Sequence, residues 1–143
     1  MTDIAFHFNV PDKLQYACRL LRKGVNSGAR LTVTGPQSVL QELDTRLWTF
    51  SALDFVPHVF NDGTDQQVRR SPVLLAEQPV PGQSHPWLVN LGDAVPDGFD
   101  QFERLIELVA QSDDDRQSAR MRWKHYSDSG YKLARFDVAS AGA

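Results

Sequence analysis

Three cationic residues at helical spacing, with an aromatic residue beside them, form the pattern in this 143-residue chain that is best suited to binding a charged ligand. At about 100° per residue, a helix places Arg116, Arg120 and Lys124 one turn apart, next to Trp123. A guanidinium holds a carboxylate or phosphate by paired hydrogen bonds, and an ammonium adds a positive charge. The stripe therefore predicts a site for an acidic peptide, a phosphate or a nucleic acid, unless it is only a solvated helix face.

The bulk composition narrows these choices. The net charge of -3 and the sequence pI near 5.7 argue against broad nucleic-acid binding, which needs a strongly positive face. No window approaches eighteen apolar residues and the N-terminus does not resemble a signal peptide, so we expect a cytoplasmic protein without a membrane partner. The length suits a single domain over residues 1–143.

The pattern of apolar residues predicts the elements that position the stripe. Strands are expected at 4–9, 30–34, 73–76 and 87–91, helices at 11–26, from Pro36 to Leu47, at 99–111 and at 113–129, and a polar loop at 61–70. Gly130 is expected to stop the last helix. Alternating strands and helices predict an α/β fold with a single doubly wound, mostly parallel sheet flanked by helices.

A second candidate surface is the aromatic stretch that contains Trp48, Phe55, Val56 and Pro57. Some of these residues must pack in the core. A proline-interrupted aromatic run is nevertheless hard to bury completely, and exposed aromatic residues at this density mark protein interfaces.

No catalytic constellation is visible in the sequence. The turn after the first strand, Asn9–Lys13, has no glycine, and Gly35 is followed by Pro36, which lacks an amide donor. The four histidines show no metal-binding spacing with one another or with Cys18. We therefore expect no enzyme activity, no cofactor and no metal.

Several short motifs together resemble the chi subunit of bacterial DNA polymerase III. They are Leu47-Trp48, the run 55–58, the run from Ala119 to Tyr126, and Gly130-Tyr131, in matching order over nearly the whole chain. The resemblance implies a P-loop-NTPase-like fold that has lost its nucleotide site, and no catalysis. It also implies binding to the acidic C-terminal tail of single-stranded DNA-binding protein, and to the psi subunit, which links chi to the clamp loader. In some bacteria a helicase uses the psi-binding surface.

Carried over by position, the tail-binding role falls on Arg116, Arg120, Trp123 and Lys124. The psi or helicase role falls on Trp48, Phe55, Val56 and Pro57. Nucleic acid would then be contacted only indirectly, and direct binding of a single strand by the basic helix is the alternative. The 61–70 segment and the residues after Asp137 do not match the family well.

Overall fold

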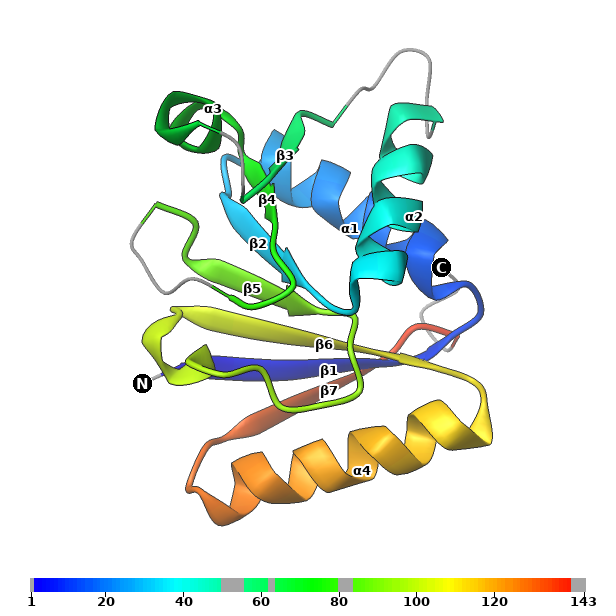
Figure 1. Ribbon diagram of the computed structural model, residues 1–143. Coiled ribbons are helices and arrows are strands. Elements are labelled where there is room, and N and C mark those ends of the chain that lie inside the picture. The colour runs from blue at the N-terminus through cyan, green and yellow to red at the C-terminus, as the bar shows by residue number, and fades with distance from the viewer. Residues whose placement is uncertain (1, 50–55, 62–63, 80–83, 140–143) are drawn as a thin grey trace.

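The computed structural model describes residues 2–49, 56–61, 64–79 and 84–139. These residues form one seven-stranded sheet in the order β3-β4-β2-β5-β6-β1-β7, and every neighbouring pair of strands is parallel. The prediction of a single, mostly parallel α/β sheet flanked by helices is therefore confirmed (Figure 1). No helix in the described part of the chain is long and apolar enough to cross a membrane.

Strands and helices alternate along most of the chain. Their bounds are β1 Asp3–Val10, α1 Lys13–Asn26, β2 Leu31–Thr34, α2 Gln37–Thr49, β3 His58–Phe60, α3 Asp65–Arg70, β4 Val73–Leu75, β5 Trp87–Asn90, a 3-10 helix Phe99–Gln101, β6 Arg104–Ala110, α4 Asp113–Asp128 and β7 Leu133–Asp137. The predicted strands and helices up to residue 49, the two middle strands and the last helix all agree with these bounds within a few residues.

The helices form a layer on each side of the sheet. Figure 1 shows α1 and α2 on one side and α4 on the other. Two buried clusters correspond to these layers: Leu21, Leu40 and Leu43 belong to the first, and Phe6 and Tyr126 to the second.

Helix α4 has strong local signals at both ends. The Ser112 hydroxyl accepts a hydrogen bond from the Asp115 amide at 3.4 Å, and three aspartates in the first turn complement the helix dipole. The helix ends at Asp128 with Ser129 as its C-cap, and Gly130 follows in the left-handed region at φ 90°, where glycine carries no steric penalty. The predicted helix and its glycine stop are confirmed.

The helix predicted at 99–111 is wrong, because this segment forms the 3-10 helix and strand β6. Phe102, Leu105, Ile106 and Val109 have helical spacing, but they belong to a run that is buried on both sides of the sheet. Ile106 packs in the α1 layer, and Leu105 and Val109 pack in the α4 layer. A central parallel strand and a buried helix cannot be separated by periodicity alone.

Three further elements differ from the sequence prediction, and the first of them is strand β3, which lies where no strand was predicted. The polar segment 61–70 contains α3, which begins with a capping box in which Thr64 and Gln67 each accept a hydrogen bond from the other's amide, at 3.2 and 2.9 Å. Strand β7 was not predicted, because the exposed side chains of an edge strand show little apolar alternation.

Candidate partner-binding site

Helix α4 presents the predicted basic stripe to solvent. Its buried residues are Ala119, Arg122 and Tyr126, which face the sheet. The side chains of Arg116, Arg120 and Lys124 are exposed, and Trp123 is half-buried. Three of the four predicted tail-binding residues, Arg116, Arg120 and Trp123, line one groove.

This groove, of about 460 Å³, lies between α4 and the strands β1 and β7 and is called here the α4 groove. It is lined by three aromatic residues, Phe6, Phe8 and Trp123, and three arginines, Arg116, Arg120 and Arg135, with Val109 and Ala119 between them. An apolar trough edged by guanidinium groups suits a ligand that carries both carboxylates and an apolar side chain.

Trp123 is held in this groove by the core beneath it. Its ring stands edge-on to Phe6, with the ring centroids 5.1 Å apart, and Phe6 contacts Tyr126 in the same way at 6.0 Å. The indole therefore packs against the core and forms one wall of the groove.

Arg116 is held at the end of the groove by Asn9. Its guanidinium donates to Asn9 Oδ1 at 3.4 Å, and Asn9 Nδ2 donates to Asp137 Oδ1 at 3.2 Å. Asn9 has φ 61°, a left-handed conformation that asparagine tolerates, at the point where the register of β1 and β6 shifts. The irregular end of β1 thus aims a polar side chain at α4.

Lys124 does not line the α4 groove, although the sequence grouped it with the other three residues. Arg135 does line it, and sequence reasoning missed this residue. Its guanidinium carbon lies 5.0 Å from the centre of the Phe8 ring and 6.0 Å from that of Trp123. Arg135 was missed because strand β7 was not predicted. This strand pairs with β1 and places Arg135 opposite Phe6.

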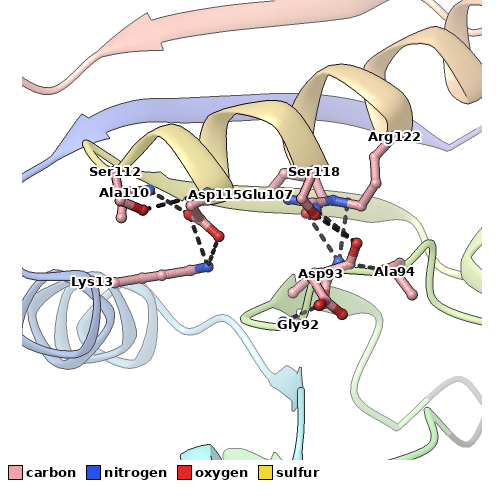
Figure 2. A network of polar contacts seen from close by, with 11 residues as sticks. Lys13, Gly92, Asp93, Ala94, Glu107, Ala110, Ser112, Asp115, Ser118 and Arg122 are labelled. Carbon is pink, nitrogen blue, oxygen red and sulfur yellow. Dashed lines mark hydrogen bonds and ion pairs between the residues drawn. The ribbon is translucent and has the colours of Figure 1, made fainter.

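Arg122 lies in the same basic run but has a structural role. It is 2% exposed, and its Nε donates to Glu107 Oε1 at 3.1 Å, where the Glu107 carboxylate is 0% exposed. Figure 2 shows Arg122 reaching between α4 and the sheet, where its Nη1 donates to the Asp93 carbonyl at 3.1 Å and to the Ser118 hydroxyl. This guanidinium is not available to a ligand.

The remaining oxygen positions of Glu107 are also satisfied. The Tyr126 hydroxyl donates to Oε2 at 2.6 Å, and Asn90 Nδ2 donates to both oxygens at 3.0 and 3.1 Å. Burial raises the pKa of the Glu107 carboxyl, and the Arg122 charge and these hydrogen bonds act against that rise. Burial and then the negative charge of Glu107 raise the pKa of Tyr126, so its hydroxyl remains a donor.

The first turn of α4 is tied to α1. Lys13 Nζ lies 3.2 Å from Asp115 Oδ2, which also accepts the Ala110 amide at 2.6 Å (Figure 2). Asp115 is therefore neutralised within the fold.

Only part of the second predicted surface, which contains Trp48, Phe55, Val56 and Pro57, is exposed. Trp48, at the end of α2, is 62% exposed, and Pro57 is also exposed, whereas Val56 is buried in the α1 layer. Phe55 lies outside the described residues. The Trp48 ring contacts His58 edge-on at 5.6 Å, and His58 Nε2 lies 2.8 Å from Asp44 Oδ1. This surface lies on the side of the sheet opposite α4.

The places where an α/β fold binds phosphate carry negative charge here. At the start of α1, the Asp12 side chain caps the helix by accepting the Gln15 amide at 3.1 Å. A crevice at the carboxyl ends of β2 and β5 is lined by Glu77, Asp93 and Asp97. Carboxylates in these positions oppose the binding of a phosphate group.

Known proteins resemble the chain in both sequence and fold. The family model for "DNA polymerase III chi subunit, HolC" matches residues 1–134. The chain belongs to the DNA polymerase III chi subunit family. It is an accessory-subunit family of the replicative polymerase, so membership connects the chain to DNA replication.

Two curated members are similar over most of their length. The DNA polymerase III subunit chi of Pseudomonas aeruginosa is 33% identical over 122 residues, which cover 85% of this chain and 83% of that protein. The corresponding subunit of Haemophilus influenzae is 26% identical over 126 residues, which cover 87% and 86%.

Among solved structures the likeness shows the fold alone. S. cerevisiae Dbp5 bound to RNA and ADP BeF3 matches with a TM-score of 0.66 at 12% identity, covering 96% of this chain and 41% of Dbp5. The C-terminal domain of the DEAD-box protein Dbp5 matches with a TM-score of 0.55 at 13% identity, covering 94% and 89%. The expectation of a P-loop-NTPase-like sheet is confirmed by these neighbours.

We expect Arg122→Met to lower the free energy of unfolding by about 3–5 kcal/mol, because it leaves the Glu107 carboxylate buried without its counter-charge. Arg120→Met makes the same change on the exposed side of α4 and should shift stability by less than about 0.5 kcal/mol. Urea unfolding of both variants measures the difference. Equal stabilities would contradict the structural role of Arg122.

Proposed function

We propose that this chain is a non-catalytic adaptor that binds the acidic C-terminal tail of single-stranded DNA-binding protein in the α4 groove. Through its Trp48 surface it would link that protein to the clamp loader by way of the psi subunit. The observation that carries the proposal is the α4 groove itself, where three arginines surround an aromatic trough on a protein of net charge -3.

The groove complements an acidic tail with an apolar end in two ways. The guanidinium groups of Arg116, Arg120 and Arg135 offer paired donors to carboxylates. The rings of Phe8 and Trp123 offer an apolar surface to a terminal hydrophobic side chain. A ligand lacking either feature would leave part of the groove unsatisfied.

The expected affinity is modest and depends on salt. Each charge-assisted hydrogen bond contributes roughly 1.5–3 kcal/mol, and micromolar binding corresponds to about 8 kcal/mol. A few such contacts, together with the burial of one aromatic ring, are sufficient for micromolar affinity. Because the groove is open to solvent, salt should screen the attraction. A partner with several tails would strengthen binding through avidity.

The second surface is suited to a protein partner. Trp48, in the last turn of α2, and Pro57, next to the His58 that the Trp48 ring contacts, are both exposed. We infer that the psi subunit, or a helicase in its place, contacts them there. This surface and the α4 groove are on opposite sides of the sheet, so one partner does not exclude the other.

Direct binding of single-stranded nucleic acid through α4 is the competing function. Such binding needs exposed rings on which bases stack, whereas Trp123 is half-buried against Phe6. Submicromolar affinity for an oligonucleotide at physiological salt, without any response to an acidic peptide, would favour this alternative.

We expect Arg120→Ala to weaken binding of a synthetic peptide with the tail's acidic, aromatic-ended sequence by at least tenfold. Loss of one charge-assisted contact has that size, because about 1.4 kcal/mol is a factor of ten. Isothermal titration calorimetry at low and physiological salt measures the change. Arg19→Ala, an exposed arginine on α1, is the matched control and should leave affinity unchanged. An unaltered affinity of the Arg120 variant would refute the assignment.

We expect Arg135→Ala to weaken the same peptide about as much as Arg120→Ala, because both arginines line the groove. Lys124→Ala should have the smaller effect, since Lys124 lies outside the lining. The order of the three dissociation constants is the measurement. If Lys124→Ala were the most damaging, the tail would lie along the exposed side of α4 and not in the groove.

We expect Trp48→Ala to abolish capture of the psi or helicase partner while leaving tail binding intact. The side chain is 62% exposed, so its loss should not unfold the protein. Met121→Ala removes another exposed apolar residue, 75% exposed and on α4, and serves as the control in the same pull-down. Full retention of the partner by the Trp48 variant would place that interface elsewhere.

A further inference from the structure

A second and larger groove lies on the side of the sheet that α1 covers. It has a volume of about 610 Å³ and runs along the starts of β1, β6 and β7, beside the last turns of α1. It is called here the edge groove, because β7 is the last strand of the sheet. Its main residues are the apolar Ala5, Ile106 and Ala134 and the cationic Lys23, Arg104 and Lys132. The proposed adaptor function uses none of them.

The edge groove is hollow because small residues meet at the β1–β7 pair. Ala5 and Ala134 are partners in the parallel register, and neither fills the space beside Ile106. Gly24 forms the α1 side of the groove, and a Cβ at this position would come within 3.2 Å of Leu31 Cδ1. The small side chains thus leave a recess in an otherwise packed α/β layer.

The rim of the edge groove is positive. Within the described residues, none of Lys23, Arg104 and Lys132 forms an ion pair, and Arg104 stacks over the Trp87 ring at 4.5 Å. Asp3, which is opposite Arg104 in the register of β1 and β6, is the acidic residue that lines the edge groove.

The positive charge extends over the groove. After burial, the charge of Lys23 is the cause that lowers the pKa of His7, another lining residue. Cations gathered around an apolar recess on an acidic protein complement an anionic, partly apolar ligand.

Strand β7 offers a backbone edge beside this recess. It pairs with β1 and ends the sheet, so its outer amides and carbonyls have no neighbouring strand in the described structure. Ala134 is exposed, and Phe136, which contacts His7 at 5.3 Å on the same side of the sheet, is 46% exposed. An open edge with an apolar face accepts an added strand, whose alternate side chains enter the adjoining recess.

We propose that the edge groove binds an extended acidic and apolar segment of a partner protein, which adds to the sheet as a strand beside β7. Its apolar side chains cover Ala5 and Ala134, and its carboxylates meet Lys23, Arg104 and Lys132. Main-chain hydrogen bonds to β7 supply affinity, and the alternation of apolar and acidic side chains supplies specificity.

A second copy of the chain fits the edge groove less well. Pairing through β7 would bring another Lys132 and Arg135 to a rim that is already positive, and like charges on adjacent strands are destabilising. A nucleic-acid backbone would match the cations but would place its phosphates against an apolar floor. The acidic and apolar peptide satisfies both features.

The test uses a phage-displayed library of random twelve-residue peptides, panned on the full chain and counter-selected on the Lys23→Glu/Lys132→Glu double variant. Both lysines are exposed, so the variant should remain folded, which circular dichroism checks. We expect the enriched peptides to alternate Asp or Glu with apolar residues. A synthetic copy should bind the double variant at least tenfold more weakly and the matched Arg19→Glu variant with unchanged affinity.

Hydrogen exchange of the complex locates the peptide. Protection of the amides of Ala134–Phe136 supports strand addition. Protection of α4 alone, or no enrichment that depends on Lys23 and Lys132, would overturn the proposal. A concentration-dependent dimer in analytical ultracentrifugation that Ala134→Trp dissolves would assign the groove to a second copy and overturn it as well.

Discussion

The buried ion pair between Glu107 and Arg122 determines how α4 lies on the sheet. A carboxylate inside a central strand costs several kcal/mol unless a counter-charge and hydrogen bonds accompany it, and α4 supplies both through Arg122 and Tyr126. With Arg122 fixed inward, a rotation of about 100° per residue turns Arg120 and Lys124 outward. The solvent-facing side of the helix is therefore set by a charge in the core.

The same rotation explains why the predicted stripe is divided. Counted from Arg122 at about 100° per residue, Trp123 and Arg116 lie nearest to the groove, and Lys124 lies on the far side of Arg120. Spacing along the chain predicted correctly that these cations share one half of the helix. It could not predict where the groove lies relative to that half, because the groove's other wall comes from β1 and β7.

Sequence reasoning succeeded where the signals were local and failed where they were tertiary. The caps, turns and alternating elements predicted the sheet and α4, because each depends on neighbouring residues. Arg120 and Arg122 cannot be told apart without Glu107, and Glu107 lay in a segment that was predicted as a helix. Arg135 acts through β7, an edge strand whose exposed side chains give a weak signal. The cations and the aromatic residue of the last helix predicted a protein that binds a partner. The packing was needed to show which of these cations are exposed.

The charge distribution of this α/β scaffold opposes phosphate binding and favours the peptide binding proposed above. Asp12 caps the first helix, and Glu77, Asp93 and Asp97 line the crevice where such sheets bind ligands. Cations lie on both sides of the sheet at this edge: Arg135 of strand β7 lies in the α4 groove, and Lys132, the residue before β7, lies in the edge groove. Because the molecule as a whole is acidic, these two grooves are local positive regions, and in the proposed roles they would attract an anionic peptide and orient it. Two acidic segments of one partner could then occupy opposite faces of the same strand, and their effective concentrations would strengthen a weak contact at each.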